Sequence, residues 1–199
     1  MTTFKKLMLA MTVLSASAVA QAADENFASI TLGQTSDKVK KSSLLNSNLD
    51  RPNANGVIGK DTTYGVRLGQ QNNDRRYYAT YDNVSGSHNG IKLRQENLLG
   101  SYDLFLPVTG STKLFGGATA GVTKLSQESS GYSRDTGYGY AVGVQTGVLQ
   151  QVSKNVSVEM GYRYLRSNAS TEMSAQGTKQ GSLSLNSSAQ TYLSANYAF

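Results

Sequence analysis

The sequence predicts an all-β protein, namely an eight-stranded, antiparallel, up-and-down transmembrane β-barrel. The first observation is the C-terminal segment 191–199, in which Thr, Leu, Ala, Tyr and Phe occupy every second position. The second is a mean hydropathy of −0.38, with no apolar run after the first 22 residues that is long enough for a helical span. The third is an export signal at the N-terminus. A barrel reconciles all three, because only alternate residues of its strands contact lipid.

The first residues have the parts of a secretory signal peptide. A positive start at Lys5 and Lys6 precedes an apolar stretch over 7–20, which ends in the small-residue motif A-Q-A. We therefore expect residues 1–22 to be a cleaved signal peptide and residues 23–199 to form the barrel domain. Because the exported chain has no cysteine, its stability does not come from disulfides.

Four alternating segments predict the first half of the barrel. Each puts aliphatic or tyrosine side chains on one face and mostly small or polar side chains on the other. The fourth segment ends at Pro107, because proline cannot donate a hydrogen bond to a strand ladder. The expected strands are 27–34, 62–70, 75–84 and 92–106. Their lipid-facing residues would be Ala28, Ile30, Leu32, Tyr64, Val66, Leu68, Tyr77, Ala79, Tyr81, Leu98, Gly100, Tyr102, Leu104 and Leu106.

The second half follows the same rule with more glycine on its inner face. A turn over 109–111 leads into the fifth strand, and a turn over 153–155 joins the sixth to the seventh. The expected strands are 112–125, 138–150, 156–165 and 188–199. Their lipid-facing residues would be Leu114, Ala118, Ala120, Val122, Tyr140, Val142, Val144, Thr146, Val148, Val158, Met160, Tyr162, Tyr164, Leu193, Tyr197 and Phe199.

The connections between these segments alternate in length. Those centred on residues 72, 109 and 154 are short, and the others are longer, polar and rich in Ser, Asn and Gly. Short periplasmic turns and long external loops are typical of transmembrane barrels. The expected external loops are 36–61, 85–91, 126–137 and 167–187.

The inner face of the predicted wall carries charged side chains. Arg67, Asp82, Asp103, Glu159 and Arg163 all have the inward parity of their strands. Isolated charges in a narrow lumen would be costly, so we expect these residues to form an interior ion-pair network. Eight strands leave a lumen just wide enough for side chains, which favours a plugged interior. A proton relay or a catalytic carboxylate set is the alternative interpretation of the same residues.

Several motifs together resemble the small outer-membrane β-barrel domain family of the OmpA-like superfamily, which includes the opacity-type proteins. They are the glycine-rich segment F-G-G-A-T-A-G over 115–121, the motif E-M-G-Y-R-Y over 159–164 and the terminal Phe199. The resemblance implies an eight-stranded barrel in a Gram-negative outer membrane. It also implies that the last strand, with Tyr197 and Phe199, is the signal recognised by the barrel-assembly machinery. The periplasmic peptidoglycan-binding domain of full OmpA-type proteins is not found in the sequence.

Basic residues in the predicted 36–61 loop suggest one kind of partner. The formal net charge of the chain is +6, and Lys38, Lys40, Lys41 and Arg51 form a cluster. We expect these side chains to be candidate contacts to outer-membrane lipids and lipopolysaccharide, although a solvated loop without a specific ligand is the simpler interpretation. Basic and aromatic residues are not interleaved as nucleic-acid binding requires. We expect a monomer whose extracellular ligand, if it has one, the sequence does not identify.

Three functions from different classes follow from this prediction. The leading hypothesis is a non-enzymatic barrel with a structural or surface-interaction role in envelope integrity, adhesion or resistance to host defences. The second is a small-solute channel or porin-like transporter. The third is a lipid-A-modifying enzyme that uses Ser85 or Ser87, His88 and Asp82. With no cysteine and one histidine, we expect no metal site and no cofactor.

Overall fold

The computed structural model describes residues 24–41, 56–88, 91–129, 135–175 and 178–199. Among these residues, no helix is long and apolar enough to cross a membrane. The expected signal peptide lies outside the described residues, as does Arg51. The strands are β1 (Glu25–Lys41), β2 (Gly56–Gln71), β3 (Arg75–His88), β4 (Ile91–Pro107), β5 (Thr112–Ser129), β6 (Asp135–Gln151), β7 (Val156–Ser167), β8 (Ser170–Ala175) and β9 (Thr178–Ala198).

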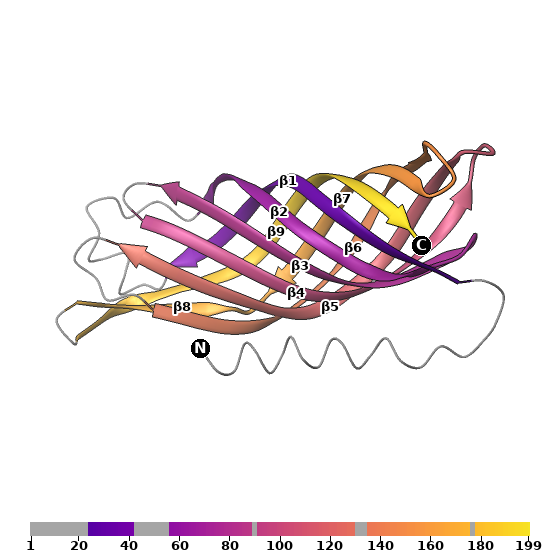
Figure 1. Cartoon of the computed structure of the whole chain (residues 1–199). Coiled ribbons are helices and arrows are strands. Elements are labelled where there is room, and N and C mark those ends of the chain that lie inside the picture. The colour runs from indigo at the N-terminus through magenta and orange to yellow at the C-terminus, as the bar shows by residue number, and fades with distance from the viewer. Residues whose placement is uncertain (1–23, 42–55, 89–90, 130–134, 176–177) are drawn as a thin grey trace.

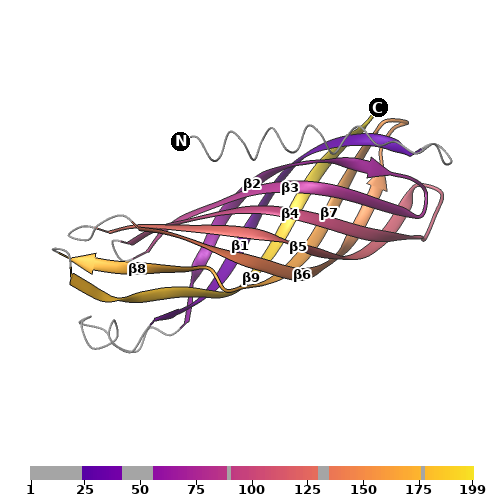
Figure 2. The same ribbon diagram turned by 90° about the horizontal axis from the view of Figure 1, so that it is seen from below.

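Eight of these strands close into an antiparallel barrel, which confirms the predicted fold (Figure 1; Figure 2). Consecutive strands pair from β1 to β7, β7 then pairs with β9, and β9 pairs with β1. Following the paired residues once around the wall leads from Ala28 to Lys38, ten residues further along β1. This offset tilts the strands against the barrel axis and sets the width of the lumen.

The three short connections lie at the end of the barrel that carries the C-terminus (Figure 1). In the first, the Asn72 side-chain oxygen accepts hydrogen bonds of 3.0 Å from the backbone N–H groups of Asp74 and Arg75. In the second, the Thr109 hydroxyl accepts a 3.1 Å bond from the N–H of Thr112. Local bonds of this kind are why Asn and Thr favour turns. The short turns are therefore where the sequence predicts them.

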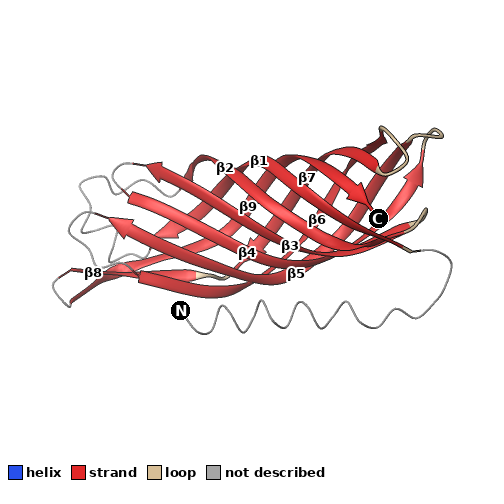
Figure 3. Cartoon of the chain, viewed as in Figure 1, coloured by secondary structure: helices blue, strands red, loops and turns tan. Residues whose placement is uncertain are grey.

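At the opposite end, the strands run further than predicted (Figure 3). β1 continues through Lys41, so Lys38, Lys40 and Lys41 lie on the wall and not in a 36–61 loop. β3 and β4 stay paired until His88 faces Ile91, so the connection expected over 85–91 is a two-residue link. Beyond the lipid both faces of a strand can be polar, because the backbone ladder persists where the hydrophobic alternation ends.

The segment expected to be a loop over 167–187 is a β-hairpin. β8 pairs antiparallel with the first part of β9, at the end of the barrel away from the C-terminus (Figure 2). At the base of the hairpin, the Leu185 N–H donates a 2.8 Å hydrogen bond to the Ala169 carbonyl oxygen. Most residues of the hairpin are polar or glycine, and the alternation of Leu183 and Leu185 with serine is short, so the hairpin has the ladder of a strand without the long apolar alternation that identified the others.

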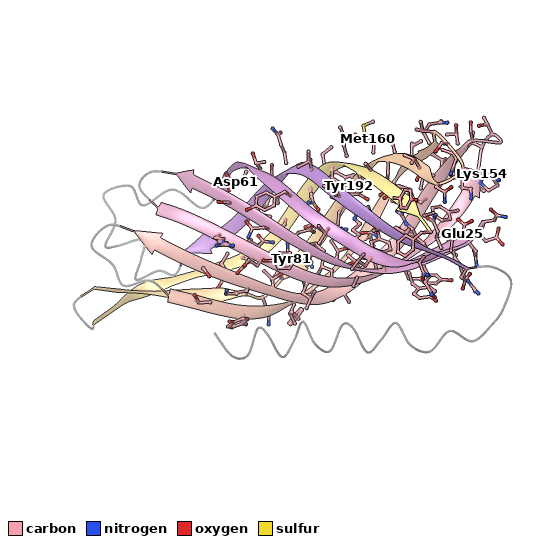
Figure 4. All side chains as sticks on the ribbon, viewed as in Figure 1. Glu25, Asp61, Tyr81, Lys154, Met160 and Tyr192 are labelled. Carbon is pink, nitrogen blue, oxygen red and sulfur yellow. The ribbon has the colours of Figure 1, made fainter. Side chains whose placement is uncertain are left out.

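The exposure of the side chains separates an outer face from an inner one. On the outside, Ile30 is 66% exposed and Leu104 58% exposed, and Met160 projects from the outer surface (Figure 4). On the inside, Thr63 and Glu159 are completely buried. Apolar-out and polar-in alternation is the arrangement that lipid requires of a barrel wall.

Glycine at position 121 is required by a close backbone approach between β4 and β5. A Cβ atom at Gly121 would lie 2.0 Å from the Leu98 carbonyl oxygen, whereas one at Gly100 would have no neighbour nearer than 3.8 Å. We expect Gly121→Ala to lower the free energy of unfolding by about 1–3 kcal/mol, because backbone must move to admit the methyl group. The matched variant Gly100→Ala should leave it unchanged. Urea unfolding followed by heat-modifiable electrophoretic mobility measures both, and equal midpoints would contradict the close approach.

Candidate functional site

The centre of the lumen holds an ion-pair cluster built from four strands. Arg67 on β2 donates to Glu159 on β7, with 2.9 Å between Nη1 and Oε1. Arg76 on β3 bridges Glu159 and Asp103 on β4, at 2.5 Å from Nη1 to Oε2 and 2.7 Å from Nε to Oδ2. All four side chains are fully buried. The carboxylates and guanidiniums therefore neutralise one another away from water.

A second ion pair continues this cluster along the lumen. Arg163 Nη1 lies 2.7 Å from Asp82 Oδ2, and Arg163 Nε donates to Gln145 Oε1 at 2.9 Å. The amide nitrogen of Gln145 in turn donates to Asp103 Oδ1 at 2.6 Å. Gln145 thus joins the pair to the central cluster. We call the six charged residues the lumen network: Arg67, Arg76, Asp82, Asp103, Glu159 and Arg163.

The structure brings the five residues of the predicted interior set into two groups. Arg67 faces Glu159, and Asp82 faces Arg163. Asp103 pairs with Arg76, a residue that the sequence analysis did not include. Arg76 has the inward parity of its strand, so the alternation of β3 places it in the lumen. Arg76 lies two residues after the turn, before the apolar alternation of β3 is established, so the pattern marks its inward face only weakly.

Aromatic rings pack around the guanidinium groups of the network. The Arg76 guanidinium lies 4.6 Å from the centre of the Phe115 ring and 5.0 Å from that of Tyr78. The Arg67 guanidinium lies 4.4 Å from the centre of the Tyr192 ring, which sits inside the barrel (Figure 4). The Tyr192 hydroxyl also donates to Glu159 at 3.0 Å. These rings exclude water from the charges and add cation–π attraction.

Another charged group lies on the outer surface of β4 and β5. Glu96 Oε2 is 2.7 Å from Lys124 Nζ, and Glu96 Oε1 is 3.3 Å from Arg94 Nη2. The Tyr81 hydroxyl donates to Glu96 Oε1 at 2.8 Å. We call Arg94, Glu96 and Lys124 the Glu96 cluster. Its charged side chains are two cations and one carboxylate.

The other residues singled out from the sequence lie apart from these groups. Lys38 is exposed on the outside of β1, and the side chains of Lys40 and Lys41 lie outside the described part of the chain. Tyr197 and Phe199 are 54% and 64% exposed, with ring centres 6.3 Å apart. Their recognition by the assembly machinery stays a prediction.

Because Arg76 bridges two buried carboxylates, we expect the free energy of unfolding to depend on this residue. Arg76→Met keeps the aliphatic stem but leaves Asp103 and Glu159 short of a buried partner, so we expect a loss of about 3–5 kcal/mol. The adjacent Arg75 is exposed, and Arg75→Met should change stability by less than about 0.5 kcal/mol. Urea midpoints of the refolded proteins measure the difference. Arg76→Lys should recover part of the loss, and equal midpoints for Arg75→Met and Arg76→Met would contradict the pairing.

Comparison with known proteins identifies the fold and the family. No protein-family model matches the sequence, and no curated protein matches it. Among solved structures, Neisserial surface protein A covers 87% of this chain, with 97% of its own length aligned, at 16% identity and a TM-score of 0.64. Ail of Yersinia pestis covers 88%, with 99% of its own length, at 14% identity and a TM-score of 0.52. These two show the shared fold.

A third solved structure is much closer in sequence. Outer membrane protein H (OprH) of Pseudomonas aeruginosa is 56% identical to this chain, and the alignment covers 88% of this chain and 99% of that one, with a TM-score of 0.57. At this identity over almost the whole of OprH, the chain belongs to the OprH family and is a small β-barrel of the bacterial outer membrane.

Proposed function

We propose that this protein is a non-enzymatic outer-membrane barrel with a closed lumen, whose outer surface binds the phosphorylated glycolipid of the outer leaflet. In this role it would contribute to the integrity of the envelope. One observation carries the proposal, namely that the outward face of several strands changes from apolar to cationic at the same end of the barrel.

The change is clearest on β4 and β5. Along β4, the outward residues Leu106, Leu104, Tyr102 and Leu98 are followed by Glu96 and Arg94. Along β5, the outward Val122 is followed by Lys124, which pairs with Glu96 in register. An apolar band about 25 Å tall is what the hydrocarbon layer requires. The Glu96 cluster therefore begins where lipid head groups begin.

This end of the barrel is opposite to the short turns. Since short turns are periplasmic in barrels of this kind, the Glu96 cluster would face the outer leaflet. Lipopolysaccharide carries phosphates at the head of its acyl chains, and guanidinium and ammonium groups are the usual partners of phosphate. Glu96 holds Lys124 at 2.7 Å, and the Arg94 side chain is half exposed. A phosphate could thus be met by a cation pair that Glu96 keeps in position.

Glycolipid binding can be tested at this cluster. We expect the double variant Arg94→Gln, Lys124→Gln to bind lipopolysaccharide at least about tenfold more weakly, because charge-assisted hydrogen bonds are lost. Fluorescence titration of the protein in neutral nanodiscs at low and high salt gives the affinity and its salt dependence. The control is Arg75→Gln, at the periplasmic end. Equal binding by the double variant and this control would refute the proposal.

The lumen supports the second part of the proposal. The charged side chains of the lumen network are buried, and each of the three arginines has a carboxylate within 2.9 Å. A solute would have to separate these pairs and displace the rings packed on them, which is costly without a replacement partner. The alternative function, a small-solute channel, requires that opening.

Conductance separates the closed barrel from the channel. We expect the wild-type protein in a planar bilayer to give no reproducible unitary current steps, because the buried, paired side chains of the lumen network occupy the narrow interior that eight strands leave. A porin measured in the same bilayer is the positive control. Unitary steps from the wild-type protein that disappear in Arg67→Ala or Glu159→Ala would support the channel instead.

The catalytic alternative can be examined only at Asp82 and Ser85, because the side chains of Ser87 and His88 lie outside the described part of the chain. Asp82 is buried in the lumen against Arg163, whereas Ser85 is exposed on the outer face of the same strand. In a catalytic triad, the nucleophile, the base and the acid must lie within hydrogen-bonding distance of one another. Here the barrel wall separates the candidate nucleophile Ser85 from the candidate acid Asp82. These positions support a non-enzymatic function.

A further inference from the structure

A second group of cations lies on the outer surface around β9. Arg166 on β7 pairs in register with Ser187 on β9, and Ser187 pairs with Lys38 on β1. Tyr164 lies two residues before Arg166 on the same outward face of β7. We call Lys38, Tyr164, Arg166 and Ser187 the β9 cluster. It draws residues from three adjacent strands.

Register and outward parity place the four side chains of the β9 cluster side by side. The side chains of Ser187 and Arg166 lie near the Tyr164 hydroxyl, and the charge of Lys38 is close enough to act on it. Arg166 and Lys38 are exposed, yet Ser187 between them is only 3% exposed. Neighbouring side chains therefore cover Ser187, and the cluster presents Lys38, Tyr164 and Arg166 at its surface.

The charge of this cluster differs from that of the Glu96 cluster. Within the described part of the chain, neither Lys38 nor Arg166 has a carboxylate at ion-pair distance, whereas Glu96 offsets one charge of the other cluster. The two positive charges lie on the two strands that flank β9, and neither has a carboxylate partner among the described residues. Like charges held together on a protein surface favour a bound anion.

The β9 cluster lies at the same boundary of the apolar band. On β7, Val158, Met160 and Tyr162 face outward before Tyr164 and Arg166. On β1, Leu32 is the last large apolar outward residue before Lys38. In the ring of eight strands β9 is diametrically opposite β4, which carries Glu96. The two clusters therefore lie on opposite walls at the level of the head groups.

We propose that the β9 cluster is a second binding site for a phosphate of the outer-leaflet glycolipid, so that one barrel holds two such lipids on opposite walls. The inference rests on the proposed function for the class of ligand. The Arg166 guanidinium has five N–H donors and is exposed, so several of these donors can reach a phosphate. Arg166 would grip two phosphate oxygens and Lys38 would supply a second charge.

Two matched double variants test the number of sites. One is Lys38→Gln, Arg166→Gln, the other is Arg94→Gln, Lys124→Gln, and Lys154→Gln at a periplasmic turn is the control. Each protein in neutral nanodiscs is titrated with bisphosphorylated lipid A, and native mass spectrometry counts the lipids retained. We expect two for the wild type and the control, and one for each double variant, with an affinity loss at the altered site of at least about tenfold.

The outcomes separate this inference from the proposed function. If only the Arg94, Lys124 variant loses a lipid, the β9 site is wrong and the function stands. If neither double variant loses a lipid, both are wrong. Equal retention of lipid A without phosphates would overturn the assigned ligand, as would displacement of lipid A by millimolar inorganic phosphate. Heat-modifiable mobility shows that each variant is folded, and Tyr164→Phe should keep the barrel while weakening the second site.

Discussion

Closure of the backbone ladder is the constraint on which the rest of this molecule depends. A sheet in lipid cannot leave an edge unpaired, because no water is present to satisfy its N–H and C=O groups. The pairing of β9 with both β1 and β7 removes the edges of the wall. With eight strands and an offset of ten residues, the same closure sets the lumen width and brings residues from distant segments to one level.

The narrow lumen determines which side chains can fill it. Three arginines and three carboxylates meet there, so the network is neutral as a whole and its members are paired as buried charges must be. Small inner residues make room for large ones. A Cβ atom at Gly161 would lie 2.4 Å from the Tyr192 ring, so the ring that covers Arg67 needs glycine opposite it.

The alternation of hydrophobicity predicted the fold and both faces of the wall, because lipid imposes that pattern wherever a strand crosses it. The same alternation also places Arg76 in the lumen, because Arg76 has the inward parity of β3. The pattern could not predict the hairpin with β8, or the parts of β1 and β9 at the end of the barrel away from the C-terminus, since the backbone ladder there continues without lipid on either face.

For the same reason the sequence assigned Lys38 to a loop, and it could not indicate that Lys38, Ser187 and Arg166 share a register. This shared register depends on the ten-residue offset of the barrel, which cannot be read from any single segment of the sequence.

The position of Lys38 on a strand has a thermodynamic consequence. Its backbone is paired on one side with Val57 of β2 and on the other with Ser187, so the backbone freedom of Lys38 is already lost in the free protein. A lysine in a flexible loop would lose backbone freedom when it binds a ligand, and this entropic cost would reduce the free energy of binding. A charge anchored in the wall meets its ligand preorganised.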